Sequence, residues 1–269
     1  ASPNDLERLP DDQRTGRIRG GYLTVLSTAV LLSPYVSGRI TDYTGSYQAI
    51  YWLSFFVALS LLYQIFWRLA DRPLPVSHLT WRAKLRDGNL RKILALDFLL
   101  NLFFFFMVIY LPIHLHRTLG FSWEKIGLIF TIMLLPFILI EYPLGWLADR
   151  KLGEKEILSL GLIIAALATI PIAFLTTKSF AIWAGLLFLT RVGASAIESM
   201  KETYLFKKVT AGDVGVISLS RLTLPLAYII GSLASLALLR FFPISSLFLL
   251  ISVLFLLGLY FSLTLKDTR

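Results

Sequence analysis

The sequence predicts an all-α protein that crosses a membrane several times, and three observations support this fold class. First, 56% of the 269 residues are hydrophobic and only 16% are charged, whereas soluble domains have about 45–50% apolar and about 25% charged residues. Second, the apolar residues fall in runs of roughly 20, the length that a helix needs to cross a bilayer. Third, lysine and arginine gather at alternate ends of these runs, as in polytopic membrane proteins.

Eight apolar runs are predicted as transmembrane helices. They span residues 18–40, 47–67, 93–113, 126–147, 157–177, 180–204, 214–239 and 244–265. They are too long for the roughly ten-residue strands of a membrane barrel and do not alternate apolar with polar residues. The basic segment 68–92 is the one long connection, so we expect two helices in residues 1–67, a cytoplasmic linker at 68–92, and six helices in residues 93–269.

The basic residues orient the predicted helices in the bilayer. Nineteen of the 26 lysines and arginines lie on one side, five lie on the other, and Arg191 and Arg221 lie inside runs. The richer side is expected to be cytoplasmic, which puts both ends of the chain in the cytoplasm. The net charge of +9 is thus explained by membrane orientation, and we expect a lipid bilayer, a bacterial inner membrane, rather than nucleic acid as the partner.

Composition argues against a metal centre or a cofactor. The chain has no cysteine and three histidines, whereas a zinc site needs three or four convergent ligands. His114 and His116 lie near a predicted membrane edge, where we expect interfacial positions. The sequence has no nucleophile-elbow pattern and no phosphate-binding glycine loop, so we do not expect an enzyme.

Residues 145–161, GWLADRKLGEKEILSLG, concentrate charge between two apolar runs. They have the form G-x-L-A-D-R-x-x-G-x-K, with Gly145, Asp149, Arg150, Gly153 and Lys155 as its principal residues. This pattern resembles the cytoplasmic loop motif of the major facilitator superfamily (MFS) of secondary transporters. In that family the motif recurs between the second and third helix of each six-helix half.

A second, looser resemblance lies in the first predicted helix. Ser33, Pro34, Ser37 and Gly38 resemble the G-P-x-x-G-G end of helix five in the family's antiporters. Both resemblances imply that the chain carries helices five to twelve of an MFS-type bundle. Residues 1–67 would then close the N-terminal bundle, residues 93–269 would form the C-terminal bundle, and helices one to four, upstream of Ala1, would be missing partners.

Asp149 is a candidate gating latch in the charged loop. An acid at a membrane edge needs a partner, and a helix N-terminus offers free amides and a partial positive charge. The resemblance implies the start of the first predicted helix, near Arg17, as that partner. Gly145 would permit close helix contact, and the basic residues would hold the loop in the cytoplasm. The alternative is a solvated loop that serves topology alone.

Ionisable side chains inside the predicted helices are costly unless they face protein or water, and so they mark function. The candidates for a substrate or proton pathway are Asp97, Asn101, Glu141, Arg191, Glu198 and Arg221. Asp97 and Asn101 are four residues apart and share a helix face, and Asp97 and Glu141 are the acids deep enough to carry a proton. Alternative roles are a buried structural pair for Arg191, interfacial ion pairs for Glu198, Lys201 and Glu202, and a structural contact of Glu141 with Arg221 or with a helix end.

These predictions converge on a secondary active transporter of a small, unidentified solute that works by alternating access. The helix-five pattern favours proton-coupled efflux by antiport. Uptake by symport in the same fold is one alternative, and an eight-span membrane enzyme is another.

Overall fold

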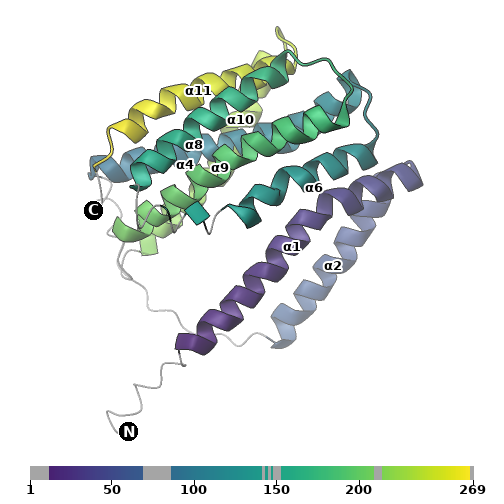
Figure 1. Ribbon diagram of the computed structural model, residues 1–269. Coiled ribbons are helices and arrows are strands. Elements are labelled where there is room, and N and C mark those ends of the chain that lie inside the picture. The colour runs from purple at the N-terminus through teal and green to yellow at the C-terminus, as the bar shows by residue number, and fades with distance from the viewer. Residues whose placement is uncertain are drawn as a thin grey trace.

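The computed structural model describes residues 12–68, 86–140, 143–144, 147, 153–208 and 214–266, with the side chains of residues 12–27, 68, 206 and 214 left aside. Every long element in these ranges is a helix (Figure 1). The helices are α1 (Asp12–Thr44), α2 (Gln48–Arg68), α4 (Gly88–Phe105), α5 (Leu111–Ile113), α6 (Trp123–Leu139), α8 (Glu154–Thr169), α9 (Phe180–Lys208), α10 (Val214–Leu238) and α11 (Ser245–Leu263). The predicted all-α membrane fold is confirmed.

Two irregular stretches lengthen these helices. Two π-helical turns, Phe106–Tyr110 and His114–Thr118, flank α5 and extend α4 as one rod to Thr118. A 3₁₀ turn, Ile170–Ala173, extends α8.

Six of the described helices are long and apolar enough to cross a membrane. They are Gln48–Trp67, Gly88–Thr118, Glu154–Ala173, Phe180–Leu205, Gly215–Leu238 and Ser245–Leu263. They coincide with six of the eight predicted spans. The other two predicted spans fall on α1 and on α6, whose described part has 17 residues, so the count of eight stays a prediction.

One end of the bundle collects the start of α4, the start of α8, the end of α9 and the end of α11. Lys92 Nζ donates to the Thr264 carbonyl at 2.6 Å, and the Tyr204 hydroxyl donates to the Lys266 carbonyl at 2.8 Å. Lys207 forms an ion pair with Glu154. We call this end the basic face, and its cations are Arg91, Lys92, Lys155, Lys207, Lys208 and Lys266. These residues fall together as the charge pattern of the sequence predicts.

Residues near the other end of the α4 rod pack more deeply than expected. His114 was predicted to be interfacial, but its ring is buried between Trp183 and Phe248, with centroid distances of 6.2 and 5.8 Å. His116 is half-buried and stacks on Trp123 at 4.4 Å. Aromatic residues from α9 and α11 thus enclose this part of the α4 rod, and the position of His114 near the membrane edge stays a prediction.

Helices α8 and α9 come into direct backbone contact in the core. A Cβ atom added to Gly193 would lie 2.5 Å from the Ala165 backbone nitrogen and 2.6 Å from the Gly161 carbonyl oxygen. Small residues let membrane helices approach until their backbones touch, and dispersion forces then hold them. The α8–α9 pair is therefore a fixed unit against which α4 and α11 pack.

Beyond its first turn, helix α2 lies beside α1 and away from the remaining helices (Figure 1). Its large apolar side chains, among them Trp52, Phe56 and Phe66, are exposed. Such a surface is stable against lipid or against other apolar helices, and not against water.

Substitution of Gly193 by alanine should destabilise the bundle by about 1–3 kcal/mol, because the added methyl group must push backbone away from backbone. Gly185→Ala, on the same helix, is the matched control, since nothing lies within 4 Å of the added Cβ. It should be neutral or stabilising by roughly 0.5–1 kcal/mol through helix propensity. Thermal melting in detergent compares the two, and equal melting temperatures would contradict the close α8–α9 contact.

Candidate functional site

A cavity of about 290 Å³ lies among α4, α9 and α10, toward the basic face. Its apolar walls include Phe104, Leu205 and Leu224. Its polar lining consists of Asp97, Asn101, Glu198, Lys201, Glu202, Ser220 and Arg221. A mostly apolar cavity with a few convergent polar groups is the usual form of a small-molecule site.

The start of α4 fixes the depth of Asp97. The Asp87 side chain accepts a hydrogen bond from the Asn89 amide at 2.8 Å, which caps the helix at the basic face. Asp97 follows nine residues after Gly88, so it lies about 13 Å along the helix. Asn101 lies one turn further and lines the same cavity, as the four-residue spacing predicts.

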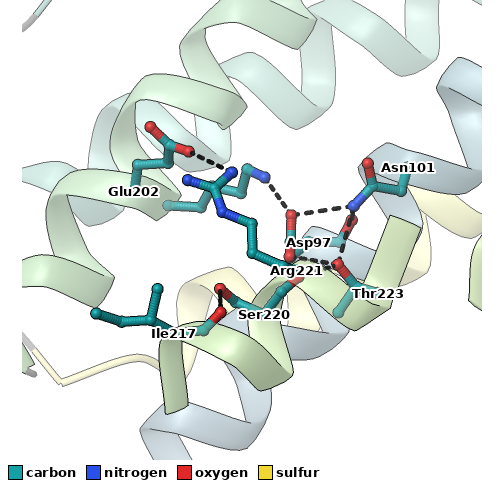
Figure 2. Close-up of polar contacts among 8 residues, drawn as sticks. Asp97, Asn101, Glu202, Ile217, Ser220, Arg221 and Thr223 are labelled. Carbon is teal, nitrogen blue, oxygen red and sulfur yellow. Dashed lines mark hydrogen bonds and ion pairs between the residues drawn. The ribbon is translucent and has the colours of Figure 1, made fainter. Parts of the chain in front are cut away.

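Asp97 is the centre of a polar network that joins three helices (Figure 2). One carboxylate oxygen forms an ion pair with Lys201 of α9 and accepts from Asn101 Nδ2 at 3.2 Å. The other oxygen lies 2.6 Å from the Thr223 hydroxyl of α10. Asn101 Nδ2 also donates to Thr223 Oγ1 at 3.0 Å. Each carboxylate oxygen of Asp97 thus has a protein partner.

The Thr223 hydroxyl has two acceptors for its one proton. It lies 2.6 Å from Asp97 Oδ2 and 2.6 Å from the Ser220 carbonyl oxygen. It can therefore donate to Asp97, or rotate to donate to Ser220 and accept a hydrogen bond from a protonated Asp97. The carboxyl group of Asp97 therefore has a hydrogen-bond partner in Thr223 whether it is ionised or protonated.

Because both side chains are largely buried, the stability of the fold depends on the Asp97–Lys201 ion pair. The two side chains are 9% and 11% exposed. Removing one partner of such a pair leaves an uncompensated charge in an apolar surrounding. The sequence places Lys201 near a membrane edge, with an interfacial pair as its expected role, and the pair with Asp97 depends on how α4 and α9 pack.

A second ion pair at the cavity is weak. Arg221 Nη1 lies 3.8 Å from Glu202 Oε1, and the two side chains are 71% and 44% exposed. Exposed pairs contribute about 0–1 kcal/mol. Glu198 lines the same cavity from α9. Glu141, the partner expected for Arg221, lies outside the described residues.

Arg191 stands apart from this cavity. It is 2% exposed and its guanidinium carbon lies 5.1 Å from the ring centres of both Phe103 and Phe104. Phe104 also lines the cavity. A single aromatic ring therefore touches both the cavity and the buried guanidinium.

The charged loop motif is described only in part. Gly145, Asp149 and Arg150 lie outside the described residues, and the predicted latch stays a prediction. Gly153 occupies the N-cap position of α8. The Lys155 carbonyl accepts from the Ser159 hydroxyl at 2.8 Å, within the first turns of the same helix.

Pro34 and Gly38, the residues of the predicted helix-five pattern, lie where α1 crosses α6. A Cβ added to Gly38 would lie 2.3 Å from the Trp123 carbonyl oxygen, and one added to Gly127 would lie 2.3 Å from the Pro34 carbonyl oxygen. Backbone contact on both helices thus requires glycine. Pro34 and Gly38 also line a second cavity of about 330 Å³ between α1, the start of α2, α6, and the part of the α4 rod that carries Val108 and Pro112.

Asp42, which sequence reasoning missed, closes the same crossing. Its two carboxylate oxygens accept from the Trp123 amide at 3.1 Å and from the Glu124 amide at 2.7 Å. These are the first two amides of α6, where a helix is short of acceptors and favours negative charge. This crossing, which we call the α1–α6 seam, lies at the helix ends away from the basic face (Figure 1).

The comparisons with known proteins agree with this architecture. A search of curated proteins finds no relative of this chain. The family model for the Major Facilitator Superfamily matches residues 111–269, which is more than half of the sequence and includes α6 to α11. The chain therefore belongs to the Major Facilitator Superfamily, whose members are secondary membrane transporters rather than enzymes.

Proposed function

We propose that this protein couples the movement of a small solute to that of a proton, with Asp97 as the proton-carrying group. The observation that carries the proposal is a buried carboxylate, balanced by Lys201, on the wall of a cavity that can hold a solute. Ionisable side chains inside membrane bundles usually mark ion and proton pathways.

Protonation of Asp97 changes the charge of the cavity. In the described state Asp97 and Lys201 cancel each other. A proton on Asp97 breaks that balance and leaves the Lys201 ammonium free, while Thr223 can turn toward the Ser220 carbonyl and accept from the new carboxyl group. The proton thus alters the charge that a solute meets, which is the basis of coupling.

The sense of coupling depends on the charge of the solute. Antiport, which the helix-five pattern favours, requires a solute that competes with the proton, such as a cation drawn to Asp97. Symport requires a solute that binds with the proton, such as an anion drawn to the freed Lys201. The glycine of that pattern has a separate explanation here, since Gly38 permits the α1–α6 contact.

Alternating access needs a contact between the two bundles that forms and breaks. The α1–α6 seam supports such a role, because Asp42 joins α1 to the free amides of α6 by two hydrogen bonds. We infer that the basic face meets the cytoplasm, so that the seam closes the other side while the solute cavity lies toward the cytoplasm. Asp149 would act at the cytoplasmic side in the opposite state.

Asp97→Asn should abolish proton coupling, because an amide side chain does not take up and release a proton as a carboxyl group does. Proteoliposomes that contain a pH-sensitive dye should change pH when wild-type protein is given a transported organic ion, with acidification for symport and alkalinisation for antiport. Thr223→Ser, which keeps the hydroxyl, is the control and should retain the signal. An equal solute-driven pH change in Asp97→Asn would contradict the role of Asp97.

Lys201→Met should destabilise the protein by about 3–5 kcal/mol, because it leaves the Asp97 carboxylate buried without its partner. The double variant Lys201→Met with Asp97→Asn should recover much of that loss, since both charges are then absent. Thermal melting of the three variants forms a double-mutant cycle. Additive losses would mean that the two side chains do not form a pair.

Asp42→Ala should loosen the α1–α6 seam. Loss of a helix cap costs about 1 kcal/mol, which corresponds to about a five-fold shift in a two-state equilibrium. The chain has no cysteine, so a single cysteine can be introduced as a probe. Ser37→Cys lies in the cavity beside the seam, and its rate of labelling by a maleimide reports how often the seam opens.

The control for that experiment is Thr44→Ala, because within the described residues the Thr44 side chain forms hydrogen bonds to Ile40 and Ser46 at the end of α1 and to none of α6. Labelling of Ser37→Cys should be about five-fold faster with Asp42→Ala and unchanged with Thr44→Ala. Equal rates in all three backgrounds would exclude Asp42 as a gate contact.

A further inference from the structure

Arg191 is a buried cation that the described residues do not neutralise. It lies in the interior of α9 and is 2% exposed. Its Nε and Nη1 atoms have no hydrogen-bond partner within the described part of the chain, and no described acid forms an ion pair with it. Glu198, on the same helix, is seven residues away, which is about 10 Å along the axis.

Such an arrangement is costly in an apolar protein. A buried charge without a partner is among the most unfavourable groups that a fold can hold. The rings of Phe103 and Phe104 offer cation–π attraction at 5.1 Å, but they do not satisfy the free N–H groups. The site therefore has the chemistry of a receptor without its anion.

We propose that Arg191 binds the carboxylate of an apolar organic acid, and that this acid is the class of solute transported. The inference rests on the proposed transport function. A guanidinium group matches a carboxylate in charge and can donate two parallel hydrogen bonds to it. Phe103 and Phe104 supply apolar contact for the body of the ligand. Phe104 contacts Arg191 and also lines the cavity, so movement of this one ring would connect them.

This site links the solute to the proton. The Asp97 charge is already balanced by Lys201, so an anion that enters the cavity meets only the exposed and weakly paired Arg221 until it reaches Arg191 or until Asp97 is protonated. A proton on Asp97 frees Lys201, and the anion then gains a second cation. Proton and anion thus strengthen each other's binding, which favours the symport mode over the antiport mode.

The experiment compares three probes of almost identical shape: benzoate, neutral benzamide and cationic benzamidine. Each is added at about 10 mM, which raises the melting temperature of a protein that binds with a Kd of about 1 mM or tighter. Wild-type protein in nanodiscs should be stabilised by benzoate and by neither of the other two. Arg191→Met should lose the benzoate effect, and Arg191→Lys should weaken benzoate binding by at least about ten-fold, because the planar pair of donors is lost.

Two features separate ligand binding from a structural role. Arg191→Met should raise the melting temperature of the ligand-free protein, because it removes a buried charge that has no partner among the described residues. Arg240→Met, at an exposed position beyond α10, is the matched control and should keep the benzoate effect. If Arg191→Met and Glu141→Gln both lower the ligand-free melting temperature and benzoate has no effect, Arg191 belongs to an internal ion pair and the proposal is overturned.

The proposal is also overturned if benzoate does not stabilise the wild type, or if it stabilises Arg191→Met equally. Asp97→Asn separates this proposal from that of proton coupling. The variant imitates the protonated acid and should bind benzoate at least as tightly as the wild type. If benzoate binding persists while Asp97→Asn still shows solute-driven pH changes, the role of Asp97 is wrong and the anion site stands.

Discussion

The ion pair between Asp97 and Lys201 is the interaction on which the rest of the site depends. It joins α4 to α9 in the interior of the bundle, and Thr223 attaches α10 to the same carboxylate. In a surrounding that offers little water, neither charge is stable alone. Three helices that would otherwise be held by apolar packing are therefore tied to one titratable group, and a proton on that group acts on all three.

Two helix crossings use the same small-residue packing for different purposes. At α8–α9, Gly161 and Gly193 bring backbones into contact, and the contact lies within the core. At the α1–α6 seam, Gly38 and Gly127 do the same, but Asp42 adds hydrogen bonds to two free amides. A carboxylate on a helix N-terminus contributes about as much as a single cap, so Asp42 adds a modest stabilisation to the packing of the two glycines, as the proposed gate would require.

Two kinds of buried charge occur in the bundle. Asp97 and Lys201 neutralise each other, whereas Arg191 has no ion-pair partner among the described residues. The balanced pair can be switched by a proton, whereas the guanidinium is always charged. Because the ring of Phe104 contacts Arg191 and also lines the cavity, an anionic solute and a proton would meet in a small volume. If transport is coupled to protons as proposed, the electrostatics of that volume, rather than any motif of the sequence, would decide between symport and antiport.

The sequence by itself determined the membrane class, the helix positions, the grouping of basic residues at one face, and the resemblance to the superfamily to which the chain belongs. These properties are local, because run length, composition and loop charge can be read without knowing which helices touch. It also marked Asp97, Asn101 and Arg191, since ionisable or amide groups within apolar runs are conspicuous. Thr223 and Asp42 gave no such signal, because a hydroxyl inside a helix is inexpensive and an acid at a helix end is common.

Only the tertiary structure decided which of these groups meet. Lys201 looked interfacial, yet its long side chain reaches Asp97 because α4 and α9 both have that end at the basic face. Gly38 was part of a loose family pattern, and its contact with α6 gave it a physical reason. The rotation of each helix about its axis and the choice of its neighbours arise from packing over the whole bundle, so the partners of a buried charge follow from the fold and not from the spacing of residues along the chain.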